Sequence, residues 1–192
     1  MEKLLSALKA IPEYPLLLEA LRSRQSAAIT GVGQINRSHI IAALSQQLAQ
    51  PVVVLCPDDS AAKRLSEELR AFLKEDVPVL PSRELTLYDS AAVSRSWEQK
   101  RLRQLYDLAE GNTPLQIFSW ESLCQRTMPK AVMARCAFRL EVGKEYAMDD
   151  LVTRLEQMGY AHCTMVEGAG QYALRGGILD VYSPAAPRPI RA

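Results

Sequence analysis

The chain has 192 residues, of which 48% are apolar, so it is long enough for one ordinary domain and a smaller second one, and disorder is excluded. Its 23 basic and 22 acidic side chains nearly cancel, which excludes an overall electrostatic attraction to nucleic acid or to an anionic membrane. The N-terminal residues do not resemble a secretory signal and no apolar run has membrane-spanning length, so we expect a cytoplasmic chain without membrane contact.

The first 129 residues alternate between helical and extended patterns. Two short helices separated by Pro12 and Pro15 are expected to open the chain. Uninterrupted apolar runs such as Val52–Leu55 indicate strands that are buried on both faces, as in a parallel sheet. The alternation therefore predicts an open α/β sheet. The expected strands are residues 26–30, 51–55, 77–80 and 115–118, and the expected helices are residues 38–49, 60–73, 102–109 and 120–126.

After Pro129 the pattern becomes rich in short strands. Glycines between these strands predict antiparallel hairpins, and Gly159 is placed to end a helix. The proline-containing residues 183–192 show no closing element, from which we expect a truncated second domain. We therefore predict an α/β domain over residues 1–129 and a small α+β domain over residues 130–192. The expected elements are strands 137–142, 162–166, 171–174 and 177–182 and a helix over residues 148–158.

A loop between the first expected strand and its helix partly matches the phosphate-binding template G-x-x-x-x-G-K-[ST]. Gly31 and Ser38 fit, but Asn36 replaces the second glycine and Arg37 replaces the lysine. Gly31 and Gly33 also half-match G-x-G-x-x-G, without its third glycine. Two interpretations stay open: a relic kept for its fold, or an anion site at a helix N-terminus.

Other polar residues give no reaction centre. Asp58 and Asp59 could bind magnesium at a strand end, but they also fit the cap and first turn of a helix, which we favour. No metal or cofactor is expected, since the two histidines lack partner spacing and the four cysteines form no C-x-x-C pair and are expected to be buried thiols. A basic run predicts a solvated helix face or, alternatively, a DNA contact: Arg95, Lys100, Arg101 and Arg103.

The segment "GQYALRGGILDVYSP", residues 170–184, is less ordinary. Its paired glycines permit a tight hairpin. Arg175 beside that turn is expected to be exposed and able to form a forked contact with a partner's carboxylate. From the residues alone, a binding surface and a mere surface decoration are both open.

The segment "MGYAHCTMVEGAGQYALRGGILDVYSP" resembles the N-terminal UvrB-homology module of bacterial transcription-repair coupling factors (Mfd) and, more distantly, the damage-recognition protein UvrB. Three further stretches follow the order of that family: "PVVVLCPDDSAAKRLSEELRAFL", "LPSRELTLYD" and "SWEQKRLRQLYDLAEG". The resemblance implies a degenerate RecA-like domain followed by a domain that docks UvrA. It also implies that ATP hydrolysis belongs to motor domains outside this chain.

The same resemblance implies the contacts of a docking module. Arg175 stands where the family has its UvrA-contacting arginine, Tyr172 is the aromatic residue beside it, and His162 lies near the place of another arginine. Ala173 stands where UvrB has a further arginine. The implied function is non-catalytic recruitment of UvrA to stalled RNA polymerase in nucleotide excision repair. Implied further partners are RNA polymerase and DNA, through other domains, and an autoinhibitory C-terminal domain. The alternative is a nucleotide-binding or ATPase domain that uses residues 31–38.

Overall fold

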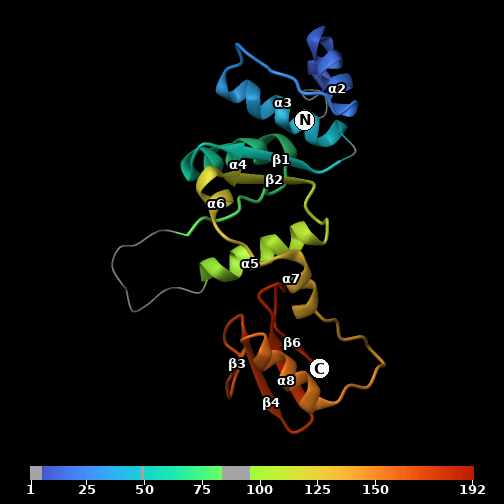
Figure 1. The fold of residues 1–192 in the computed structure, drawn as a ribbon, viewed down its shortest axis with the longest axis vertical. Helices are drawn as coiled ribbons and strands as arrows, with labels where there is room; N and C mark the ends of the chain where they lie inside the picture. Colours follow the sequence, from blue (N-terminus) through green and yellow to red (C-terminus); the bar gives the residue numbers. More distant parts are fainter. Residues whose placement is uncertain (1–5, 49, 84–95) are drawn as a thin grey trace, which may run out of the picture. The chain divides into compact units, whose positions relative to one another are not determined.

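The computed structural model of the chain describes residues 6–48, 50–83 and 96–192 (Figure 1). The described residues form two compact units. The first comprises the residues up to 83 together with residues 111–125, and the second comprises residues 96–110 and 126–192. The predicted domain boundary after residue 129 stays a prediction. In the described part of the chain, no helix is both long and apolar enough to cross a bilayer.

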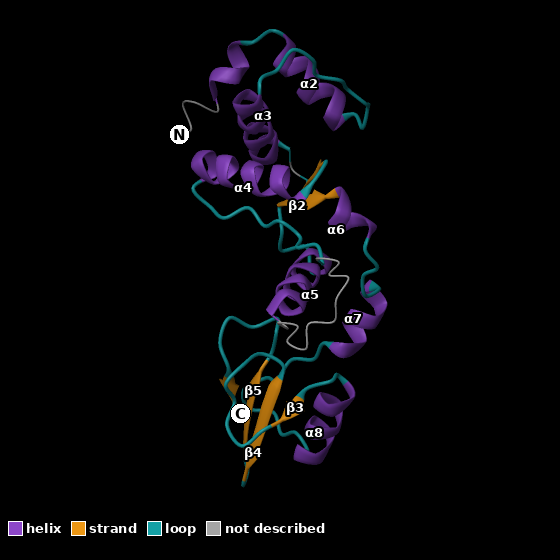
Figure 2. Cartoon of the chain, turned by 90° about the vertical axis from the view of Figure 1, so that its left-hand side faces the viewer, coloured by secondary structure: helices purple, strands orange, loops and turns teal. Residues whose placement is uncertain are grey.

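The first unit is a layered arrangement of helices on two parallel strands. The two strands pair in register from Val52 with Leu115 to Cys56 with Ser119. One helix, α4, packs against both strands, and α3 packs against α4 (Figure 2). The elements of this unit are η1 (Leu8–Ala10), α2 (Glu13–Arg22), α3 (Gln34–Gln47), β1 (Val52–Cys56), α4 (Asp59–Leu73), β2 (Leu115–Ser119) and α6 (Trp120–Cys124).

Helix α4 lies at the centre of this unit, in contact with α3 and both strands. Its sequence favours a helix at both ends. The Asp58 side chain caps its N-terminus by accepting a hydrogen bond of 2.7 Å from the Ala61 amide. Lys74 ends the helix in the left-handed conformation with φ of 63°. Between these ends, the fully buried Leu69 packs in a cluster with Ala42 of α3 and Ile117 of β2.

The sequence predicted more strand in this unit than the structure contains. Residues 26–30 form no strand and are exposed, since two alanines and one isoleucine bury too little apolar area to fix one. Residues 77–80 contribute only one bridge, between Val79 and Ile117, because Pro78 lacks a donor for a ladder. The prediction that β1 is buried on both faces is also wrong: Val53 is 61% exposed, because α4 covers only the opposite face.

The second unit is a small mixed sheet with helices. Its strand order is β3-β4-β5-β6, with β3 parallel to β4 and the other two pairs antiparallel. Helix α8 lies along one face of this sheet (Figures 1 and 2). The elements are α5 (Ser96–Ala109), α7 (Lys130–Cys136), α8 (Met148–Gln157), β3 (Ala161–His162), β4 (Gln171–Arg175), β5 (Ile178–Tyr182) and β6 (Ile190–Arg191).

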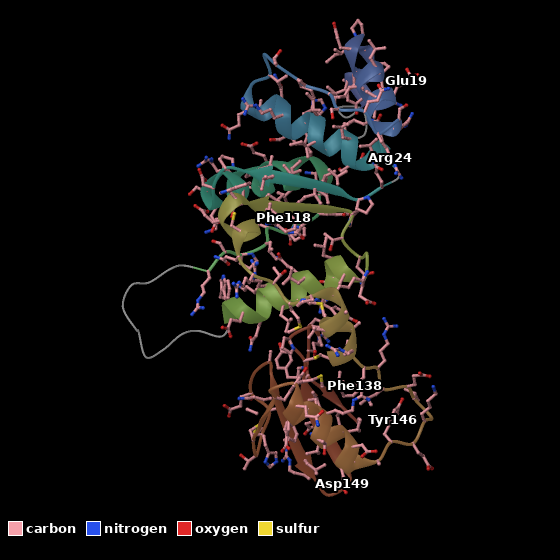
Figure 3. The ribbon with its side chains drawn as sticks, viewed as in Figure 1. Glu19, Arg24, Phe118, Phe138, Tyr146 and Asp149 are labelled. Carbon is pink, nitrogen blue, oxygen red and sulfur yellow. The ribbon has the colours of Figure 1, made fainter. Side chains whose placement is uncertain are left out.

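The core of the second unit is formed by α8 and the facing side of the sheet. Leu155 of α8 packs with Tyr172 of β4 and Leu179 of β5. Phe138, labelled in Figure 3, packs on the edge of this core, and the Arg154 guanidinium lies 4.4 Å from the centre of its ring. Gly159 follows α8 with φ of 83°, as the expected helix end requires.

Three predictions for this unit are wrong. Residues 137–142 form no strand. The apolar side chains of Phe138 and Leu140 still pack on the core, but from an irregular segment. β3 is parallel to β4, so these two strands form no hairpin. Residues 190–191 form β6 beside β5, where no element was expected, and its edge position tolerates the preceding Pro189; the expected truncation of the domain stays a prediction.

The fold class is confirmed in its coarse form. The chain is mixed α/β, with a two-stranded parallel sheet in one unit and a small mixed sheet in the other. All four cysteines are free, but the expectation that they are buried holds fully only for Cys56, whose burial raises the pKa of its thiol. Cys163 is half-buried, whereas Cys124 and Cys136 are exposed.

Candidate interaction surface

The β4–β5 hairpin presents Arg175 at its tip. Arg175 and Ile178 pair across the hairpin, joined by a turn of two glycines, and Gly176 has φ of 61°. A positive φ at the first of two turn residues fits a type II′ turn, which glycine adopts without strain. The Arg175 side chain is 59% exposed and Ile178 is 47% exposed, so the tip is accessible.

Strand alternation separates the two faces of this hairpin. Tyr172 lies on the face that α8 covers. Ala173 and Arg175 lie on the opposite face, together with Asp180, which pairs with Ala173 across the hairpin. Because Ala173 is buried, the accessible part of that face is the end that carries Arg175.

The Asp180 carboxylate lies between two arginines on this face. It accepts hydrogen bonds of 2.6 Å from Nε and 2.9 Å from Nη2 of Arg191, which stands opposite it on β6. Arg175 approaches the same carboxylate less closely, with 3.5 Å between Nη2 and Oδ2. The Arg191 hydrogen bonds hold the pKa of Asp180 below its usual range, and Arg175 contributes less.

Tyr172, the second predicted docking residue, is a core residue. It is only 2% exposed and packs with the apolar residues of α8. Its hydroxyl donates a hydrogen bond of 2.9 Å to Oε1 of Glu156. Burial, and then this carboxylate, raise the pKa of the tyrosine. Tyr172 thus packs strand β4 of the hairpin against α8.

His162, the third predicted docking residue, is exposed on β3. It stands beside Tyr172 in the sheet, and the two ring centroids are 5.1 Å apart. Neighbours in register share a face, so His162 lies on the α8 side of the sheet and Arg175 on the other. The structure therefore does not bring the three residues onto one surface, and their role as contacts stays a prediction.

The residues that resemble a phosphate loop lie at the start of α3. The helix begins at Gln34, so Asn36 and Arg37 are already in its first turn. The Arg37 amide donates to the Gly33 carbonyl at 3.1 Å, and its Nε donates to the Val32 carbonyl at 3.1 Å. The Arg37 amide and its Nε thus donate to carbonyls of the loop itself, although Gly31 keeps φ of 73°.

No sequence pattern indicates a role for Glu68, whose side chain reaches this loop from α4. Its carboxylate accepts hydrogen bonds from the Ser38 hydroxyl and, at 2.8 Å, from the Gln34 side chain. Ser38 is fully buried. The hydroxyl that would face a nucleotide-bound magnesium ion is therefore hydrogen-bonded to an internal carboxylate. The partner lies 30 residues away on another helix, which only the packing of α3 on α4 brings into contact.

A pocket of about 680 Å³ lies instead at the end of the parallel strands, lined by residues that include Asp58, Asp59, Ser82, Trp120 and Glu121. None of residues 31–38 lines it. Burial alone would raise the pKa of Asp59, but hydrogen bonds from Ser119 and Ser82 outweigh it, and the pKa is lowered. In the described ranges, no group of three or more His, Cys, Asp or Glu side chains could hold a metal ion.

The basic run is less exposed than predicted. Arg95 lies outside the described residues. Arg101 is 5% exposed, so it does not belong to a solvated face, and it lies over the ring of Trp97. Arg103 pairs with Asp107 at 2.8 Å and donates to the Ala185 carbonyl. Lys100 is exposed, but the described part of the run offers no continuous basic patch for a nucleic acid, because Arg101 is buried.

Comparisons with known proteins match this chain to one protein family. The family model of the UvrB interaction domain matches residues 138–192, which contain the hairpin. The chain is 32% identical over 186 residues to a transcription-repair-coupling factor of Myxococcus xanthus, covering 93% of this chain and 16% of that protein. It is similar to those of Escherichia coli, at 30% identity over 93% of this chain and 15% of the relative, and of Bacillus subtilis, at 26% over 91% and 15%.

The chain thus spans about a sixth of the length of the curated relatives that it matches, 16% of one and 15% of two others. These matches confirm the resemblance that the sequence of residues 158–184 indicated.

Proposed function

Since this chain is homologous to a part of the transcription-repair-coupling factors and contains a UvrB interaction domain, we propose that it is a non-catalytic module that recruits UvrA. In this function it offers UvrA a surface like that of UvrB. The observation that carries the proposal is that the matched residues 138–192 contain an exposed arginine at the tip of a hairpin, on a face that α8 does not cover.

The contact chemistry is a charge-assisted hydrogen bond. Arg175 has a planar guanidinium whose donors match the geometry of a carboxylate. Its contact with Asp180, at 3.5 Å, is longer than a strong hydrogen bond, so its donors are available to a partner. Ile178, exposed beside it, adds apolar area to the same tip. Of the three residues that the resemblance names, Arg175 is therefore the main contact in this proposal.

The first unit, in the same proposal, is a RecA-like domain that has lost nucleotide binding. Its support is the loop geometry: the Arg37 Nε donates to the Val32 carbonyl, and Glu68 places a negative charge at Ser38, where a phosphate would be repelled. ATP-driven translocation belongs to other parts of the full-length protein. RNA polymerase, DNA and an autoinhibitory C-terminal domain are partners of those parts, as the resemblance implies.

The test is a calorimetric titration of UvrA from the same bacterium with the wild-type chain, with Arg175→Ala and with Arg188→Ala. We expect Arg175→Ala to weaken binding by about 1.5 to 3 kcal/mol, the usual loss for a charge-assisted contact. Arg188→Ala is the matched control, because it removes the same charge from an exposed position in the same unit.

Equal losses in the two variants would mean that only net charge matters and would remove Arg175 from the site. A wild-type chain that does not bind UvrA at all would refute the recruitment function itself.

A further inference from the structure

Helix α5 is folded with the second unit, although the chain places it between two segments of the first. Before it, Val79 forms a bridge with Ile117 of the first unit, and after it residues 115–119 form β2 of the same unit. The helix itself belongs to the second unit, together with residues 126–192. The family model matches only from residue 138 onward, so α5 lies outside the segment that identifies the docking domain.

Two side chains of α5 bind the open end of the β4–β5 hairpin. Gln99 and Arg103 are four positions apart, so they lie on one face of the helix. Gln99 Nε2 donates a hydrogen bond of 2.8 Å to the Ala169 carbonyl, and Arg103 Nη1 donates to the Ala185 carbonyl. Ala169 lies two residues before β4 and Ala185 three residues after β5, so the helix contacts the chain on both sides of the hairpin.

Arg103 is held in this position by its own helix. Its Nε donates a hydrogen bond of 2.8 Å to Oδ2 of Asp107, one turn further along α5. The guanidinium therefore joins a carboxylate of α5 to a carbonyl beside the sheet. A hydrogen bond from a charged donor is about twice as strong as one between neutral groups, so this contact is a firm one.

The hairpin needs such a contact because its neighbouring strands are short. β3 and β6 have only two residues each. At the open end, the Gly170 amide donates to the Tyr182 carbonyl at 2.7 Å. Short ladders fray from their ends, where each residue has the fewest neighbouring hydrogen bonds. The contacts at Ala169 and Ala185 oppose this fraying, and they thereby restrict the directions in which the tip with Arg175 can point.

We infer that Gln99 and Arg103 are positioning residues for UvrA binding: by holding the open end of the hairpin, they fix the direction of the Arg175 guanidinium at its tip. The inference rests on the proposed function, because it assigns supporting residues to the same docking surface. It also makes α5 a part of the docking module, which then comprises more than the matched residues 138–192.

The experiment is a double-variant cycle in the full chain. UvrA affinity is measured for wild type, Arg103→Ala, Arg175→Ala and the variant with both changes. We expect Arg103→Ala to weaken binding about three- to tenfold in the wild-type background, but less than about twofold once Arg175 is replaced, because it acts through Arg175. Additive losses would make Arg103 a direct contact and overturn the inference, as would wild-type affinity in Arg103→Ala.

Two further variants separate position from charge. Gln99→Ala removes the other hydrogen bond without changing the charge, and it should weaken binding about two- to fivefold, again only while Arg175 is present. Lys100→Ala removes one exposed positive charge from the same helix, and its affinity should stay within about twofold of wild type. An equal loss in Lys100→Ala and Arg103→Ala would show a charge effect and overturn the inference.

A second measurement does not depend on UvrA. In the isolated chain, hydrogen exchange of the Gly170 amide reports the open end of the hairpin, and the NMR order parameter of the Gly176 amide reports its tip. Arg103→Ala should speed the exchange and lower the order parameter, whereas Lys100→Ala should change neither. A tip as ordered as in wild type overturns the inference even if UvrA binds as proposed. If wild type fails to bind UvrA but both changes appear, the recruitment function fails and the part of α5 in holding the hairpin stands.

Discussion

At the scale of single residues, burial distinguishes a core residue from a surface residue in a case where the sequence alone does not. Tyr172 and Arg175 are three positions apart on one strand, so they project to opposite faces, one toward α8 and the other to solvent. The family resemblance implied that both are docking residues. Tyr172 is 2% exposed, so it contributes to the surface by supporting the strand that carries Arg175.

Tyr172→Phe tests this division. The ring and its packing stay, but the hydrogen bond to Glu156 is lost, so we expect the free energy of unfolding to fall by about 0.5 to 1.5 kcal/mol. UvrA affinity should stay within about twofold of wild type, because the hydroxyl lies on the α8 side of the sheet. Urea unfolding and the UvrA titration measure the two quantities. A large loss of affinity with unchanged stability would make the hydroxyl a contact.

At the scale of elements, the contact between α3 and α4 decides what the loop at residues 31–38 can do. The strand that would precede a phosphate loop is absent, and α3 starts at Gln34, so the Arg37 amide makes a helical hydrogen bond to the Gly33 carbonyl. Glu68 then joins the two helices through Ser38 and Gln34. The loop is held by protein contacts in the place where a nucleotide fold would use phosphate.

Glu68→Ala should therefore destabilise the first unit. It leaves the buried Ser38 hydroxyl with only the 3.5 Å contact to the Gln34 carbonyl, so we expect a loss of about 1 to 3 kcal/mol in the free energy of unfolding. Glu67→Ala, at the exposed neighbouring position, is the control and should change it by less than about 0.5 kcal/mol.

Urea unfolding, followed by the fluorescence of Trp120 in the first unit, measures both variants. The interpretation of the loop would fail if calorimetry gave saturable micromolar binding of magnesium ATP that Arg37→Ala abolishes.

The helices of this chain could be predicted well from sequence, and the strands only in part. The helix α4 has its cap, its periodicity and its end within one segment, so residues 60–73 were predicted almost to its bounds. The strands depend on partners far away in sequence. Residues 26–30 and 137–142 look like strands locally but find no ladder among the described residues, whereas the two residues of β6 form one because β5 lies beside them.

The candidate site was predictable where its residues lie within one segment, and it was not predictable where distant segments bring its residues together. The glycine pair and Arg175 lie within one hairpin, so their arrangement is local. Arg191 is 11 residues from Asp180 beyond a proline-rich segment, and the pairing of β5 with β6 alone brings them together. The opposite faces of His162 and Arg175 likewise follow from the register of β3 with β4, which no sequence pattern encodes.

At the scale of the whole molecule, the described residues form two apolar cores that share no residue. One gathers α3, α4, β1 and β2 around Leu69, and the other gathers α8, β4 and β5 around Leu155. Each is an apolar cluster with its own sheet, so each can be disrupted separately. The near-zero net charge of +1 gives the chain no overall electrostatic attraction to DNA.

Because the two cores share no residue, we expect the two units to unfold independently. Leu69→Ala and Leu155→Ala each remove a buried side chain and should cost about 2 to 5 kcal/mol in their own unit, moving its urea midpoint by about 1 to 2 M. The two tryptophans report the units individually: Trp120 lies in the first and Trp97 in the second. In single-tryptophan chains made with Trp97→Phe or Trp120→Phe, Leu69→Ala should shift only the Trp120 transition and Leu155→Ala only the Trp97 transition. Equal shifts of both signals with either variant would show one cooperative core, and UvrA binding would then depend on Leu69 as strongly as on Leu155.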